Sequence, residues 1–142
     1  MGAEPWSYFT PYQENVAAAL EELKQQEFEA GRYRMLDPDN PPASIEDAFE
    51  DMDADGTGSI LDMMGVTDAP HEVDADAPHF CMVAPLSTEQ LIELYGTDKP
   101  ARAMVEANQD FYEWIDRGMG ISIVVYDGDR PSELYFAGYS FD

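Results

Sequence analysis

Twelve residues in the middle of the chain have the spacing of a calcium-binding loop. An EF-hand loop presents about six oxygen ligands from positions 1, 3, 5, 7, 9 and 12 and turns sharply at a glycine in position 6. In the segment 51–62 the glycine is Gly56, and the six oxygen-bearing residues are Asp51, Asp53, Asp55, Thr57, Ser59 and Asp62. The spacing therefore predicts a calcium-binding module with these six residues as the metal ligands.

Several features of the same region count against calcium. Position 8 is Gly58, where paired loops have an apolar residue, and position 12 is an aspartate instead of the longer glutamate. Gly65, Thr67 and Pro70 follow too closely for an exiting helix. In a chain with 30 acids, alternating aspartates also arise easily by chance. We therefore favour the interpretation that 51–62 is an acidic surface loop.

Other patterns that could do chemistry are weaker. His79 and Cys81 are two residues apart in a predicted strand, so both would point to one face and could form a thiolate–imidazole pair. Cysteine is, however, among the most buried residue types, and the run FCMV fits a core strand better. His71, Glu72, Asp74 and His79 lack the close spacing of a zinc site. No catalytic residue and no cofactor other than calcium is predicted, which disfavours an enzyme.

The charge of the chain is extreme and unevenly distributed. The net charge is -23, and the interval 35–98 contains 16 acids and no Lys or Arg. Surfaces normally mix both signs, because like charges destabilise a compact state. One explanation is a positively charged macromolecular partner, captured by an inhibitor, an immunity-like factor or a DNA mimic. The other is environmental, a halophilic type of solvation. Direct binding to nucleic acid is disfavoured, because its phosphates are also negative.

The predicted partner-binding surface combines two acidic loops with one aromatic residue. Trp6 lies in an aromatic segment that covers the edge of the core, and an exposed indole there would anchor a partner. The residues assigned to this surface are Asp51, Asp53, Asp55, Asp74, Asp76 and Trp6. The expected partner is a basic protein.

Hydrophobic periodicity predicts a single α+β domain over 1–142, with about four helices on a mostly antiparallel sheet. The expected helices cover 11–30, 44–52, 88–95 and 98–117, and the expected strands cover 59–64, 79–84, 121–126 and 133–141. Ser44 is expected to cap the second helix, and Ser87 with Gln90 to form a capping box. The last two strands form a hairpin with two apolar faces, which favours the centre of the sheet.

The ends of the chain favour a cytoplasmic protein. The N-terminus has no basic region followed by an apolar segment, and no apolar run is long enough to span a membrane. The single cysteine, Cys81, excludes an internal disulfide.

Four segments of the sequence resemble a family of small, uncharacterised bacterial proteins. They are EPWSYFTPYQ at 4–13, GTGSILDM at 56–63, VAPLS at 83–87 and FAGYSFD at 136–142, so that the resemblance spans essentially the whole chain. It implies one domain of bacterial cytoplasmic type, and it carries no activity, cofactor or catalytic residue.

Overall fold

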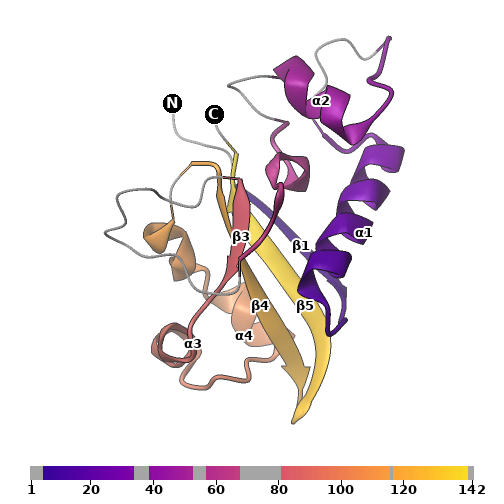
Figure 1. Ribbon diagram of the computed structural model, residues 1–142. Coiled ribbons are helices and arrows are strands. Elements are labelled where there is room, and N and C mark those ends of the chain that lie inside the picture. Colours follow the sequence, from indigo (N-terminus) through magenta and orange to yellow (C-terminus); the bar gives the residue numbers. More distant parts are fainter. Residues whose placement is uncertain (1–4, 34–38, 53–56, 68–80, 116, 141–142) are drawn as a thin grey trace.

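The structure is a computed structural model that describes residues 5–33, 39–52, 57–67, 81–115 and 117–140, with only the backbone for 49–52. The helices come in two groups along the chain, with strands before, between and after them (Figure 1). In chain order they are β1 (Pro5–Pro11), α1 (Val16–Ala30), α2 (Ile45–Met52), the 3₁₀ helix η2 (Ile60–Asp62), β2 (Gly65–Val66), β3 (Met82–Pro85), α3 (Thr88–Tyr95), α4 (Arg102–Ala107), the 3₁₀ helix η3 (Asp110–Trp114), β4 (Met119–Asp127) and β5 (Arg130–Tyr139).

The strands form one mixed sheet in the order β1-β5-β4-β3-β2. The hairpin strands β4 and β5 pair with each other, and β5 also pairs antiparallel with β1. On the other side of the hairpin, β4 pairs parallel with β3, and β3 pairs parallel with the short β2. The predicted α+β fold with a C-terminal hairpin inside the sheet is confirmed.

Both faces of this sheet are covered by helices. Alternate side chains of β4 and β5 point to opposite faces, as strand geometry requires. On one face Leu134 and Phe136 pack with Leu20 and Leu23 of α1 and with Ile60 of η2. The other face has its own apolar cluster, which includes Val105 of α4, Phe111 of η3, and Ile121, Ile123, Val125, Tyr135 and Ala137 of the hairpin. Figure 1 shows α1 on one side of the sheet and α3 and α4 on the other.

Local capping signals in the sequence are confirmed. The Ser87 hydroxyl accepts a hydrogen bond from the Gln90 amide N–H, and the Gln90 side chain accepts one from the Ser87 N–H. Gly96 then ends α3 with a left-handed φ of 73°. The Ser44 hydroxyl likewise accepts from the Asp47 N–H at the start of α2. These bonds involve residues at most a few positions apart, so the sequence contains all that they need.

Four predicted elements differ from the structure. The helix expected from 11 begins only at Val16, because Pro11 still belongs to β1 and Asn15 caps the helix. The segment 98–117 is not one helix, because α4 ends at Ala107 and a 3₁₀ turn follows it at Asp110. The predicted strand at 59–64 is instead η2, which begins where the Ser59 hydroxyl accepts from the Leu61 N–H. The strand predicted from 79 begins only at Met82.

Two strands were not predicted, the two-residue β2 and the N-terminal β1. Pro5 and Pro11 lie at the two ends of β1. Because of these prolines and the imperfect alternation of aromatic and polar residues between them, the sequence does not show the pattern typical of a strand. An edge strand tolerates proline because one side of its backbone needs no ladder partner. The N-terminal aromatic segment is therefore the edge strand β1, paired with β5 from Pro5↔Tyr139 to Pro11↔Glu133.

Candidate functional site

The interpretation of 51–62 as an acidic surface loop is wrong for its second half, which is a buried polar network. Asp62 Oδ1 accepts a hydrogen bond from the Thr57 N–H at 2.6 Å and another from the Thr57 hydroxyl at 2.8 Å. The hydroxyls of Thr57 and Ser59 are also hydrogen-bonded to each other, at 2.8 Å. All three residues are at most 1% exposed. A carboxylate that is buried in this way needs hydrogen-bond donors. The network supplies them and holds the second half of the loop in the core.

The first half of the loop is outside the described part of the chain. Asp53 and Asp55 are not described, and for Asp51 only the backbone is, at the end of α2. After the loop the chain enters β2 at Gly65, where an EF-hand would continue into its second helix. Within the described ranges, no group of three or more His, Cys, Asp or Glu could hold a metal ion.

The predicted anchor Trp6 is a core residue. Its side chain is 5% exposed and belongs to the cluster beneath α1. The indole packs where Gly120 and Gly138 have no side chains, since a Cβ at Gly138 would come within 2.6 Å of the ring. The idea of an exposed Trp6 is therefore corrected: the aromatic alternation of β1 turns the ring inward. Asp74 and Asp76, the other loop residues assigned to the partner surface, are outside the described residues.

The geometry around Cys81 does not favour a nucleophile. Cys81 has a left-handed φ of 63° in the turn before β3, so strand alternation does not relate its side chain to that of His79, which is not described. Burial raises the pKa of the Cys81 thiol, and the nearby Asp62 carboxylate raises it further. A raised pKa lowers the thiolate fraction at neutral pH, and the thiolate is the reactive form.

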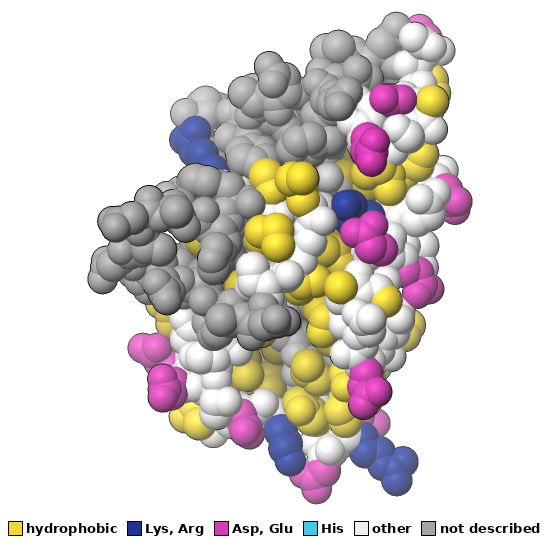
Figure 2. All heavy atoms as spheres, in the orientation of Figure 1, with side chains coloured by type: hydrophobic (Ala, Val, Ile, Leu, Met, Phe, Trp, Pro, Cys, Tyr) yellow, Lys and Arg dark blue, Asp and Glu magenta, His cyan; other side chains and the backbone are white. Residues whose placement is uncertain are grey.

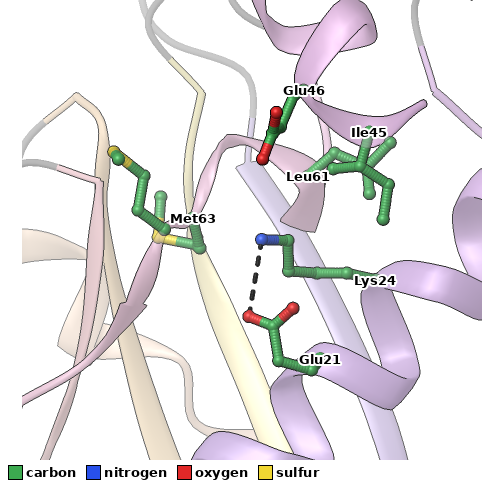
Figure 3. Close-up of a pocket in the computed structure, with 7 residues that line it drawn as sticks. Glu21, Lys24, Ile45, Glu46, Leu61 and Met63 are labelled. Carbon is green, nitrogen blue, oxygen red and sulfur yellow. Dashed lines mark ion pairs between the residues drawn. The ribbon is translucent and has the colours of Figure 1, made fainter.

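A cavity of about 430 Å³ lies where α1, α2 and η2 meet. We call it the α1–α2 cavity. Its lining combines apolar side chains with three charged ones, and it consists of Glu21, Lys24, Ile45, Glu46, Leu61, Met63 and Met64. Figure 3 shows the Lys24 ammonium projecting from α1 into this space, with the Glu21 and Glu46 carboxylates pointing toward it from two sides. The volume is in the lower part of the range typical of ligand pockets.

The charges in this cavity are only loosely matched. The Lys24 ammonium is 3.7 Å from Glu21 Oε1, and the side chain of Lys24 is 9% exposed while that of Glu21 is 62% exposed. Glu46 is exposed at the start of α2. Two carboxylates thus face one ammonium, so the lining has an excess of negative charge. Such an arrangement can accept a cation more easily than an anion.

Another acidic residue of α1, Glu27, is buried and forms an ion pair within the fold. Glu27 is 5% exposed, and its carboxylate accepts a hydrogen bond from Arg32 Nε at 2.8 Å. This hydrogen bond raises the pKa of the Arg32 guanidinium. Burial raises the pKa of the neighbouring Tyr8 phenol. Lys24 in α1 and Arg32 directly after it are therefore both paired with glutamates of α1.

The outer surface of α1 and α2 is rich in exposed carboxylates. Figure 2 shows acidic side chains along the side of the molecule where Figure 1 places these helices, with exposed hydrophobic side chains between them and β3. We define the α1–α2 surface by the described exposed acids in and next to the two helices: Glu14, Glu21, Glu22, Glu29, Glu46 and Asp47. Lys24 is paired with Glu21 and Arg32 with the buried Glu27, so the other five carboxylates generate a negative field there.

Sequence reasoning did not find the α1–α2 cavity. Its charged residues come from two helices that are separated along the chain, so only the fold brings them together. One local signal was present. Lys24 lies four residues after Leu20, and Glu27 lies four residues after Leu23, so both polar residues fall on the apolar stripe of α1. A lysine and a glutamate on the buried side of a helix indicate a polar site beneath it.

Comparison with protein-family models, curated proteins and solved structures found no match to this chain. Among the helices that the structure describes, none has both the length and the apolar character required to cross a membrane.

Proposed function

We propose that this protein is a cytoplasmic, non-enzymatic binding protein that captures a positively charged macromolecule. The observation that carries the proposal is the α1–α2 surface, which has six exposed carboxylates. Of the two bases beside it, Lys24 is paired with Glu21 of this surface and Arg32 with the buried Glu27, so the surface keeps a net negative charge. The interval 35–98, which contains acids but no Lys or Arg, begins between these helices and extends the negative charge along the sequence. The expected partner is a basic protein.

The physical effect of such a surface is mainly on association. A concentrated negative field attracts a basic partner from a distance and orients it, which raises the association rate. The Debye length is about 8 Å at physiological ionic strength, so added salt weakens this attraction steeply. We therefore expect the association rate to fall as salt rises, while the dissociation rate depends on short-range contacts.

The test compares two charge reversals of equal size. In one variant Glu14, Glu22 and Glu29, all on the α1–α2 surface, are changed to Lys. In the control variant Glu113, Asp127 and Asp129, which are exposed and lie outside the α1–α2 surface, are changed to Lys. Basic proteins captured from the native lysate are identified by mass spectrometry, and association of the purified partner is then followed at increasing salt.

The proposal predicts that the α1 variant associates at least about tenfold more slowly, whereas the control variant changes much less. The same reversal at Asp51, Asp53 and Asp55 measures what the acidic loop adds. Equal losses in the two matched variants would mean that only the total charge matters. That result, or the absence of any basic partner, would favour the environmental explanation of the acidity.

A further inference from the structure

We propose that the α1–α2 cavity receives an arginine side chain of the basic partner. This inference rests on the proposed function and adds the chemical group that the surface recognises. The cavity is continuous with the α1–α2 surface, because Glu21 and Glu46 belong to both. A partner drawn to this surface by charge would therefore meet the cavity directly.

The apolar lining suits the stem of a long basic side chain. Ile45, Leu61 and Met63 line the cavity together with its charged groups. Met64 also lines it and is 69% exposed, the largest exposure of a big hydrophobic side chain in the described ranges. Methionine adapts its shape to a partner, and both methionine and arginine are enriched in protein interfaces. The methylene groups of an arginine would cover the exposed Met64 side chain.

The charges in the lining suit a guanidinium better than an anion. Glu46 and Glu21 supply carboxylates at the mouth, and the 3.7 Å separation from Lys24 leaves Glu21 able to accept further bonds. A planar guanidinium has five donors and can bind carboxylates in pairs, and it loses less hydration energy than an ammonium when it is partly buried. An anion would bind Lys24 alone, against two carboxylates and a net charge of -23.

The surroundings of the cavity fit a residue within a polypeptide. A second hollow of about 430 Å³ shares Ile45 and Glu46 with the α1–α2 cavity and extends along α1 past Gln25 and Phe28. The start of α2 thus lines both hollows. A peptide could thus place its arginine in the first hollow while its neighbouring residues lie over the second.

The test follows the methionine methyl groups by NMR while small probes are added. The probes are acetyl-arginine amide, its neutral isostere acetyl-citrulline amide, and acetate. Assignment uses Met63→Leu and Met64→Leu. We expect the Met63 and Met64 methyl signals to shift with the arginine probe and to move little with the other two.

Two matched variants separate the cavity from the general field. Glu46→Gln removes a lining carboxylate, and we expect it to weaken arginine binding about fivefold, a loss of about 1 kcal/mol. Asp47→Asn makes the same charge change on the adjacent exposed residue, outside the lining, and should change binding less than about twofold. Lys24→Met removes the competing ammonium and should strengthen binding about threefold.

Equal effects of Glu46→Gln and Asp47→Asn would overturn the inference, and so would binding of the citrulline probe as tightly as the arginine probe. Acetate shifts that disappear in Lys24→Met would show an anion site instead. These failures differ from failure of the proposed function. Salt-sensitive capture of a basic partner would then persist in Glu46→Gln as in the unmodified protein, whereas loss of the proposed function would remove capture altogether.

Discussion

Replacement of Asp62 by Ala tests whether the hydrogen bonds of this carboxylate stabilise the fold. We call a residue with this role a structural lock. The carboxylate is fully buried and accepts two hydrogen bonds from Thr57. Without it the Thr57 hydroxyl can turn to Ser59 Oγ, 2.8 Å away, but the buried Thr57 N–H loses this acceptor. An unsatisfied buried donor costs about 1–3 kcal/mol and the emptied space about 1 kcal/mol more. We therefore expect Asp62→Ala to lower the free energy of unfolding by roughly 2–4 kcal/mol.

Two further substitutions at the same network give a graded series. Thr57→Val keeps the backbone N–H bond and loses only the hydroxyl, so it should cost about 1 kcal/mol. Asp62→Asn keeps an oxygen acceptor and should cost less than Asp62→Ala. Glu93→Ala, at an exposed position on α3, is the control and should stay within about 0.5 kcal/mol. Urea unfolding followed by tryptophan fluorescence gives the four free energies.

The series also separates the lock from a calcium ligand. Each variant is unfolded once with a chelator and once with calcium. A structural lock predicts the same loss in both conditions, whereas a ligand of calcium predicts a loss that appears mainly when calcium is present. If Asp62→Ala were as stable as Glu93→Ala in the chelator, the hydrogen bonds to Thr57 would have no structural importance and the reasoning would be refuted.

Three other predictions follow from the fold and its charges. Calcium at millimolar concentration should raise the melting temperature little more than magnesium does, because both screen the acidic surface; a single saturable calorimetric site lost in Asp53→Ala would contradict this. Burial raises the pKa of Tyr95 and Tyr112, so their contribution to stability is complete below pH about 10 and is lost as the pH rises further; the unfolding free energy should fall there, less steeply in Tyr95→Phe. Deletion of 133–142 removes most of β5, the partner of both β1 and β4, and an unchanged cooperative transition in circular dichroism would refute the importance of this strand.

The sequence predicted those elements whose determinants are local. The capping box of Ser87 and Gln90 and the ends of helices at Gly31 and Gly96 each depend on residues within one or two helical turns. The hairpin was predicted from alternation that leaves both faces apolar, and the cover of α1 on one face and α4 on the other explains that pattern. The apolar residues on both faces of the hairpin strands thus indicated that each face is buried, although the sequence did not show which helices cover them.

The interruption of the predicted helix 98–117 could not be foreseen, because its cause is tertiary. Asn108 has an extended backbone, with φ -135° and ψ 111°, where the helix would continue. Its amide donates to the Leu94 carbonyl at 2.9 Å, and its own carbonyl accepts from the Tyr95 hydroxyl at 3.0 Å. These bonds tie the end of α4 to α3. A propensity summed along 98–117 does not contain this contact between two elements.

The candidate site was predictable only in part for the same reason. Composition indicated a strongly negative protein, but of the six carboxylates of the α1–α2 surface only Glu46 and Asp47 lie in the interval 35–98. The α1–α2 cavity depends on how α2 and η2 pack on α1. The aromatic anchor was misplaced because an edge strand turned Trp6 inward. The exposed apolar residue beside the acids is Met64, and it follows a buried run in which Ile60, Leu61 and Met63 are at most 2% exposed.

Solvation and capture make different demands on an acidic surface. Solvation in a salty medium requires only that carboxylates be exposed, and apolar surface beside them would be a disadvantage. Capture of a basic protein requires both, because the field brings the partner near and the apolar contact holds it. Next to the α1–α2 surface, Met64 is 69% exposed at a cavity that Glu21 and Glu46 also line. Carboxylates that served solvation alone would have no need of this neighbour, and for that reason we favour capture.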